Sequence, residues 1–196
     1  MGRCFTIHLI RHLPTAGNKE KRYIGWTDEP ILESTASFRD LTSTESLYGS
    51  DLLRARQTAA FYFPTAVYSE DSKWRECNFG EFEGKTYEDL EKKEAYRKWI
   101  DDPYRNAPTE GESLKDVESR VLLALLEVPN QAVIVTHGGP IRVILTKFSS
   151  EEKEFWSWDI PHGSGYRLEW ESEKAFKEGK PCTSILVAHR TAKGSM

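Results

Sequence analysis

The sequence has few cysteines, no long apolar run and no excess of basic residues, and each shortage excludes a class of protein. Its three cysteines are odd in number, far apart and without a CxxC spacing: Cys4, Cys77 and Cys182. This pattern favours free thiols in a reducing compartment over a disulfide framework. No stretch approaches the roughly 18 apolar residues of a membrane-spanning helix, and no apolar signal segment follows the start. We therefore expect a cytoplasmic protein without membrane partners.

The charge balance also argues against one large class of partners. Lys and Arg total 27 and Asp and Glu total 31, which gives a formal net charge of −4. Nonspecific nucleic-acid binding requires a concentrated basic face, so we expect no nucleic-acid partner. The chain of 196 residues has 6 Trp, 8 Tyr and 9 Phe, more aromatic residues than disordered chains contain. Its length suits a single domain over residues 1–196.

Short apolar runs alternate with helical patterns along the chain. The runs 4–10 (CFTIHLI) and 132–135 (AVIV) are apolar on both alternating faces, which is typical of central strands covered on both sides. Further strands are predicted at 47–48, 66–68, 165–171 and 184–188. Helices are predicted at 30–41, 52–63, 94–100 and 140–148, after a capping box formed by Thr86 and Asp89, and from Ser113 onward. This alternation predicts an α/β three-layer sandwich with a mainly parallel central sheet flanked by helices.

Histidine and arginine residues follow the predicted strands. Arg11 and His12 follow the first buried strand, His137 follows the second, and Arg54 stands in the first turn of a helix after a short strand. In an open α/β sheet, ligands bind beyond the carboxyl ends of the strands. These side chains are therefore predicted to line one cationic pocket, which suits a phosphate group.

Each of these residues also has an ordinary structural interpretation. A histidine after a strand is often a turn residue, and an arginine that opens a helix is often a solvated charge. We favour the functional interpretation because three separate segments would have to reach the same sheet edge by coincidence. A metal site made of His12, His137 and His162 is the alternative, but the sequence has no HxH or HExxH spacing to support it. No metal or other cofactor is therefore predicted.

Five ordered stretches resemble the motifs of the histidine phosphatase (phosphoglycerate mutase-like) superfamily. They are 9–18 (LIRHLPTAGN), 25–30 (GWTDEP), 53–59 (LRARQTA), 74–80 (WRECNFG) with Glu83-Gly84, and 134–139 (IVTHGG). The stretch 111–113 (GES) also matches. The resemblance covers residues 4 to 148 in the order of the family, and it implies the phosphoglycerate mutase-like form of the three-layer sandwich.

The resemblance implies a role for each residue of the predicted pocket. His12 would be the nucleophile that forms a phosphohistidine, and Glu76 would protonate the leaving oxygen, with Glu81 and Glu83 as competing carboxylates. His162 could point into the pocket, but we favour an ordinary turn residue there. The groups expected to hold the phosphoryl oxygens are Arg11, Arg54 and His137, with Asn18, Thr15, Gly138 and His162 as the further substrate-binding candidates.

Two departures from the family leave the activity open between three interpretations. Leu13 stands where the family normally has Gly, and Pro14 replaces a common Glu. We expect a metal-independent phosphatase of small phosphomonoesters. The alternatives are a cofactor-dependent phosphoglycerate mutase and an inactive member that binds phosphorylated ligands or a protein. Only 36 positions separate Glu76 from Glu112, whereas the mutases have a longer insertion there, which favours hydrolysis. The stretch 96–112 is similar to α-ribazole phosphatases. The substrate is not predicted, and the oligomeric state stays open, with a homodimer as one option.

Overall fold

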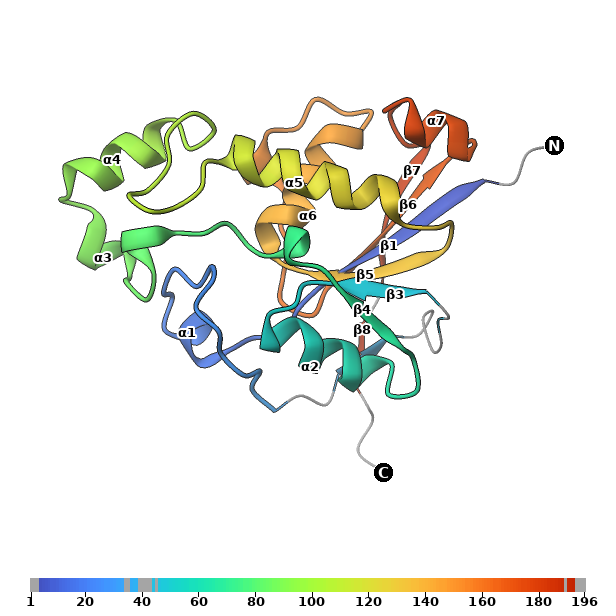
Figure 1. Ribbon diagram of the computed structural model, residues 1–196, viewed down its shortest axis with the longest axis horizontal. Coiled ribbons are helices and arrows are strands. Elements are labelled where there is room, and N and C mark those ends of the chain that lie inside the picture. Colours follow the sequence, from blue (N-terminus) through green and yellow to red (C-terminus); the bar gives the residue numbers. More distant parts are fainter. Residues whose placement is uncertain (1–3, 34–35, 39–43, 45, 189, 193–196) are drawn as a thin grey trace.

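A computed structural model describes residues 4–33, 36–38, 44, 46–188 and 190–192, and in them a six-stranded sheet forms the centre of the molecule (Figure 1). The strand order is β4-β3-β5-β1-β6-β7. The first four strands in this order pair in parallel, whereas β6 and β7 pair antiparallel at one edge. The strands are β1 (Phe5–Arg11), β3 (Leu47–Gly49), β4 (Tyr68–Glu70), β5 (Ala132–Thr136), β6 (Gly165–Trp170) and β7 (Ser184–Ala188).

Helices cover both faces of this sheet. Helices α5 (Leu114–Glu127) and α6 (Gly138–Phe148) lie on one face, and α2 (Leu53–Tyr62) lies on the other (Figure 1). The strands divide their side chains accordingly, since Ile134 joins the core cluster with α5 and α6 while its neighbour Val135 joins the cluster with α2. The predicted three-layer α/β sandwich with a mainly parallel sheet is therefore confirmed.

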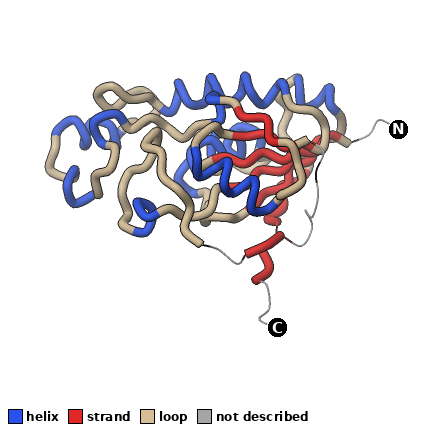
Figure 2. Tube along the Cα trace, turned by 60° about the horizontal axis from the view of Figure 1, so that its bottom comes forward, coloured by secondary structure: helices blue, strands red, loops and turns tan. Residues whose placement is uncertain are grey.

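A smaller helical arm extends beyond the sheet. Helices α3 (Tyr87–Leu90) and α4 (Glu94–Asp101) lie at the left of Figure 2, away from the strands. The arm has its own apolar cluster, made of Phe82, Leu90, Tyr96 and Trp99, with Tyr23 and Phe79 packed against it. The hydroxyl groups of Tyr23 and Tyr96 lie 2.6 Å apart, within hydrogen-bond distance. The arm is thus fixed to the loop that follows β1.

Several predicted boundaries differ from the structure. The predicted helix at 30–41 is wrong where the chain is described, because 36–38 form strand β2 (Ala36–Phe38), paired with β8 (Arg190–Ala192); 34–35 and 39–41 lie outside the described residues. The strand predicted at 66–68 lies at Tyr68–Glu70. Helix α6 begins two residues before Pro140, which the first turn tolerates because its N–H groups have no partner within the helix.

The capping box predicted at Thr86 and the helix start predicted at Ser113 are confirmed. Asp89 pairs reciprocally with Thr86 at the start of α3, and Asp116 does the same with Ser113 at the start of α5. The remaining short elements are α1 (Ala16–Lys19), α7 (Glu173–Lys177) and the 3-10 turns η1 (Ser72–Trp74), η2 (Gly80–Phe82) and η3 (Phe155–Ser157). The three cysteines are free thiols. No helix in the described part of the chain is long and apolar enough to cross a membrane.

Candidate active site

Two strand ends bring His12 and His137 together. Strands β1 and β5 pair in parallel with Arg11 opposite Thr136, and each histidine is the next residue of its chain segment. The backbone N–H of His12 donates to the carbonyl of Thr136 at 2.9 Å, which extends the pairing by one step. The two imidazole rings consequently lie with their centroids 5.0 Å apart. The prediction that these histidines share one sheet edge is confirmed.

The surroundings of His12 fix its tautomer and its charge. Its Nδ1 lies 2.7 Å from the carbonyl oxygen of Leu13, and a carbonyl can only accept, so Nδ1 carries the proton and Nε2 keeps a lone pair. His12 is only 3% exposed. Burial lowers the pKa of His12 well below its ordinary value of 6.5, and the positive charges of Arg54 and Arg11 lower it further. His12 is therefore a neutral imidazole at pH 7.

Leu13 fits its position without the conformational freedom of glycine. The non-glycine residues with positive φ in the described part of the chain are Lys21, Glu110 and Gln131, so Leu13 has an ordinary backbone conformation. Its side chain is fully buried, and its N–H donates to Oγ1 of Thr58 at 2.9 Å. These contacts hold the Leu13 carbonyl against the His12 ring, so this departure from the family pattern leaves the loop ordered.

Two buried arginines supply positive charge beside the histidines. The Arg54 side chain crosses from α2 to the loop after β1, where Nη1 donates to Thr27 O at 2.9 Å and Nη2 to Gly25 O at 2.5 Å. Nη1 of Arg11 donates to the carbonyl of Ile160. Burial lowers the pKa of both guanidinium groups, that of Arg11 to about 10, which still leaves Arg11 charged at pH 7. Within the described residues neither arginine forms an ion pair.

Several polar atoms of this cluster are buried without a hydrogen-bond partner among the described residues. They are both ring nitrogens of His137 and the Nε atoms of Arg11 and Arg54. An unsatisfied buried polar group costs about 1–3 kcal/mol, so native proteins keep such groups mainly where a ligand or water meets them. Burial lowers the pKa of His137 well below 6.5, so its ring is neutral and offers one N–H. The arrangement suits an anion with several oxygens.

His162 also belongs to the cluster. It lies in the loop before β6, and its ring centroid is 5.0 Å from that of His12. Its Nδ1 lies 3.4 Å from the carbonyl oxygen of His12. Burial, followed by the charge of Arg11, lowers the pKa of His162 to about 4. His162 does lie in a turn, as preferred from the sequence, and that turn directs its ring against the His12 ring; a contact of His162 with a substrate stays a prediction.

Glu76 lies in the segment after η1, and its carboxylate faces the part of the site that holds His12 and His137, here called the histidine side. Both of its oxygens lie 3.1 Å from the backbone nitrogen of Gly139, in the first turn of α6, and Oε1 also accepts the N–H of Cys77 at 2.9 Å. Glu76 is 9% exposed. The carboxylate thus lies at the N-terminus of α6, next to His137.

Gly139 permits this close approach, and sequence reasoning missed its role. A Cβ atom at Gly139 would lie 2.2 Å from Oε1 of Glu76, closer than any two such atoms can come. The available signal was the second glycine of the Gly138-Gly139 pair, because a glycine that adjoins a functional group often marks a close contact. Gly138, which was a candidate substrate-binding residue, lies beside the Arg11 guanidinium, since a Cβ atom built there would be 3.4 Å from Cζ of Arg11.

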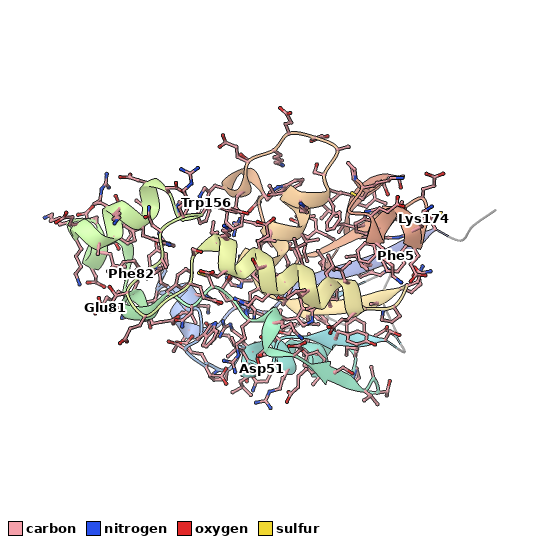
Figure 3. All side chains as sticks on the ribbon, turned by 45° about the horizontal axis from the view of Figure 1, so that its top comes forward. Phe5, Asp51, Glu81, Phe82, Trp156 and Lys174 are labelled. Carbon is pink, nitrogen blue, oxygen red and sulfur yellow. The ribbon has the colours of Figure 1, made fainter. Side chains whose placement is uncertain are left out.

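The two competing carboxylates lie elsewhere. Glu81 is exposed, and it projects from the outer part of the molecule beside Phe82 (Figure 3). The Glu83 carboxylate organises the loop after β1 instead of facing the histidines. It accepts hydrogen bonds from the backbone N–H groups of Gly25, Trp26, Thr27 and Phe79 and from the Thr27 hydroxyl.

Thr15 and Asn18 form a capping box at the start of α1. The Thr15 hydroxyl accepts the Asn18 N–H at 3.3 Å, and the Asn18 carboxamide oxygen accepts the Thr15 N–H at 3.1 Å. These bonds shape the loop between His12 and the Arg54 contacts; direct contact of Thr15 and Asn18 with a substrate stays a prediction. Within the described residues no group of three or more His, Cys, Asp and Glu side chains is arranged to hold a metal ion.

Comparisons with known proteins agree with this geometry. The chain is 28% identical over 165 residues to a 2,3-bisphosphoglycerate-dependent phosphoglycerate mutase of Methylocella silvestris, covering 70% of this chain and 78% of the relative. It is 28% identical over 174 residues to phosphoserine phosphatase 1 of Hydrogenobacter thermophilus, covering 80% and 82%. The crystal structure of an alpha-ribazole phosphatase from Shigella flexneri has the same fold, with a TM-score of 0.70, 22% identity and 86% and 92% coverage.

The model of one protein family matches most of the chain. It spans residues 7–179, from β1 to the end of α7, and therefore includes both histidine-bearing strand ends, Glu76 and the helical arm. Proteins of this family are phosphatases and mutases. The chain belongs to the histidine phosphatase superfamily (branch 1).

Proposed function

We propose that this protein is a metal-independent phosphatase that hydrolyses small phosphomonoesters through a phosphohistidine at His12. The observation that carries the proposal is the pairing of a neutral His12, whose Nε2 keeps its lone pair, with two buried guanidinium groups that have no ion-pair partner among the described residues. A neutral imidazole is a nucleophile, and fixed cations stabilise the charge on a phosphoryl group during transfer.

In the first step, Nε2 of His12 attacks the phosphorus of the ester. The phosphorus–nitrogen bond forms as the bond from phosphorus to the leaving oxygen breaks, and Glu76 in its acid form donates a proton to that oxygen. Arg11, Arg54 and His137 donate hydrogen bonds to the phosphoryl oxygens. The alcohol leaves, and the phosphoryl group stays on His12.

In the second step, water replaces the alcohol. Glu76, now a carboxylate, accepts a proton from the water that attacks phosphorus, and the phosphorus–nitrogen bond breaks to restore neutral His12. Inorganic phosphate then leaves. The same carboxylate serves both steps because the second is the reverse of the first with water in place of the alcohol. His162, packed against the His12 ring, is proposed to contact the phosphoryl group or the departing alcohol.

The relatives support this reaction type and leave the substrate open between several small phosphate esters. One relative is a phosphoserine phosphatase by name and a structural neighbour is an alpha-ribazole phosphatase, whereas another relative is a mutase. In a mutase the phosphoryl group of the phosphohistidine passes to a second substrate hydroxyl instead of water. An inactive binding member would need the cationic cluster but not a carboxylate opposite it, so the position of Glu76 favours an enzyme.

Hydrolysis of p-nitrophenyl phosphate in excess EDTA tests the proposal. We expect turnover to be unaffected by the chelator and inhibited by vanadate, which imitates pentavalent phosphorus. Loss of activity with EDTA that a divalent cation restores would contradict a metal-independent mechanism. Binding of phosphate without any hydrolysis would indicate the inactive alternative, and phosphoryl transfer to 3-phosphoglycerate in preference to water would indicate a mutase.

A further inference from the structure

We propose that Arg120 is a positioning residue for Glu76. Together with Glu112 it holds residues 73–78, here called the acid segment, so that the Glu76 carboxylate points toward His12 and His137. This inference rests on the proposed role of Glu76 as the proton donor. Arg120 lies on α5 and forms no hydrogen bond with His12 or His137 in the described structure, although its charge is among those that lower the pKa of His137.

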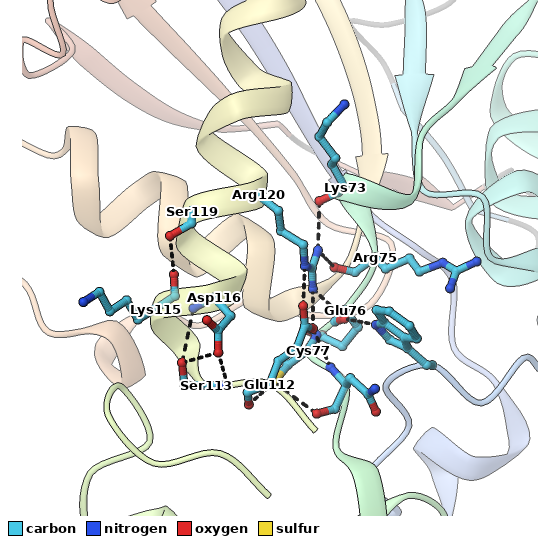
Figure 4. A network of polar contacts seen from close by, with 12 residues as sticks. Lys73, Arg75, Glu76, Cys77, Glu112, Ser113, Lys115, Asp116, Ser119 and Arg120 are labelled. Carbon is cyan, nitrogen blue, oxygen red and sulfur yellow. Dashed lines mark hydrogen bonds and ion pairs between the residues drawn. The ribbon is translucent and has the colours of Figure 1, made fainter. Parts of the chain in front are cut away.

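All five N–H groups of the Arg120 guanidinium have an acceptor (Figure 4). Nε and Nη2 bind the Glu112 carboxylate at 2.8 and 2.9 Å in a bidentate pair. The three remaining N–H groups donate to main-chain carbonyls of one segment: Nη1 to Lys73 O at 2.8 Å and Arg75 O at 2.7 Å, and Nη2 to Glu76 O at 2.9 Å. The guanidinium thus contacts the main chain of the proton donor itself.

The segment needs such support because it lies between elements. Residues 75–79 belong to no helix or strand, so their carbonyl groups lack ladder partners. Besides Arg120, the indole Nε1 of Trp26 donates to Glu76 O at 2.9 Å, and Glu112 accepts the Asn78 N–H at 2.9 Å. The Glu112–Arg120 pair therefore binds the main chain of this segment on both sides of Cys77, at Glu76 O and at Asn78 N–H.

Glu112 and Arg120 are built as a unit at the start of α5. Their side chains are 18% and 17% exposed, so the ion pair is largely shielded from water. Glu112 precedes Ser113, whose capping box with Asp116 begins the helix that presents Arg120 two turns later. The 111–113 (GES) stretch resembled a family motif but had no place in the predicted pocket. In the structure it connects the start of α5 to the acid segment.

Loss of the guanidinium would free three main-chain carbonyls around Glu76. Displacement of a reacting group by about 1 Å can cost on the order of 10²-fold in rate. The proton donor matters most for a poor leaving group, so a misplaced Glu76 should slow alkyl phosphates far more than p-nitrophenyl phosphate. An ion pair that only stabilises the fold would instead change the melting temperature and leave the ratio between the two substrates constant.

The experiment measures kcat/KM of the purified protein for both ester types in Arg120→Met, Arg120→Lys, Glu112→Gln and the double variant Arg120→Met/Glu76→Gln. We expect Arg120→Met to lose about 10²-fold with an alkyl phosphate and several-fold less with p-nitrophenyl phosphate. Arg120→Lys should recover part of the loss, and Glu112→Gln should show the same substrate pattern to a smaller degree. In the Glu76→Gln background, Arg120→Met should add little, since the group that it positions is gone.

Asp116→Ala is the matched control, because it removes the capping box of the same helix without a contact to the acid segment. It should lower the melting temperature and leave the ratio between the two substrates unchanged. Equal losses for both substrates in Arg120→Met, or full additivity with Glu76→Gln, would overturn the positioning role. If Arg120→Met does not fold, Glu112→Gln decides by the same ratio. If Glu76→Gln itself shows no dependence on the leaving group, the proposed proton donor is wrong, independently of Arg120.

Discussion

The histidine side of the candidate site takes its geometry from the central sheet, whereas the carboxylate side takes its geometry from side-chain hydrogen bonds. His12 and His137 follow paired strands, and their positions are set by the ladder between β1 and β5. Glu76 lies in a segment without regular structure, held by Arg120, Trp26 and the N–H of Gly139.

This difference predicts how each side responds to substitution. A sheet ladder is supported by many bonds and by the core on both faces, so a side chain on it can change without moving its backbone. A loop held by a few side chains moves when one of them is lost. Changes on the histidine side should therefore remove individual chemical functions, whereas changes on the carboxylate side should displace one function by degrees.

The largest effect is expected for His12→Ala. The substitution removes the nucleophile, and loss of a catalytic nucleophile lowers kcat by on the order of 10⁶-fold. The loss should be as large for p-nitrophenyl phosphate as for an alkyl phosphate, because no phosphoenzyme can form with either. Steady-state assays of both esters, with circular dichroism to confirm folding, measure this. Near-native turnover in the variant would exclude His12 as the nucleophile.

On the carboxylate side, Glu76→Gln should give a loss that depends on the leaving group. A general acid contributes about 10²–10⁴-fold, so kcat with an alkyl phosphate should fall within that range and kcat with p-nitrophenyl phosphate should fall much less. Glu83→Gln is the comparison, because its carboxylate organises the loop at 25–27. It should lower thermal stability without the same substrate dependence. The reverse pattern would assign the proton donor to Glu83.

Gly139→Ala tests the contact that joins the two sides. The added Cβ would lie 2.2 Å from Oε1 of Glu76, so the carboxylate must move away from the N-terminus of α6. We expect about 10²-fold lower kcat/KM with an alkyl phosphate, which is typical for a displacement of about 1 Å, and again a smaller loss with p-nitrophenyl phosphate. Equal losses for both substrates would mean that the methyl group disturbs the phosphate pocket rather than the proton donor.

The smallest effect concerns the dependence of stability on pH. Burial lowers the pKa of His12 and His137 in the folded protein, whereas an unfolded histidine has its ordinary value of 6.5. Below pH 6.5 the unfolded chain therefore binds more protons, and the free energy of unfolding falls by up to about 1.4 kcal/mol per pH unit for each such group. His137→Gln should make this slope shallower in urea denaturation between pH 6.5 and 5. An unchanged slope would contradict a neutral buried His137.

The histidine side could be predicted from the sequence, because it follows from features that a sequence displays. Two continuous apolar runs identify central strands, and the residues directly after them must lie at one sheet edge if the strands are parallel. Arg54 was predicted in the same way from the start of α2. The structure agrees for Arg11, His12, Arg54 and His137, although their proposed chemical roles stay predictions.

The supports of the carboxylate side could not be predicted, because they depend on contacts between distant segments. Arg120 looks like one charged residue of an amphipathic helix, and nothing in its spacing indicates three carbonyl groups more than 40 positions away. His162 was likewise taken for a turn residue, since its proximity to His12 arises only when the loop before β6 crosses the end of β1. The helix predicted at 30–41 failed because its apolar pattern was weak and pairing with β8 determines the conformation of Ala36–Phe38.

A rapid-quench experiment with a radiolabelled phosphate ester tests the phosphohistidine most directly. During turnover, the protein should carry a phosphoryl group that is labile in acid and stable in alkali, and peptide mapping should locate it on His12. The label should be absent from His12→Ala and should accumulate in Glu76→Gln if that variant slows the attack of water. Turnover without any labelled protein, or a label on a residue other than His12, would contradict the mechanism.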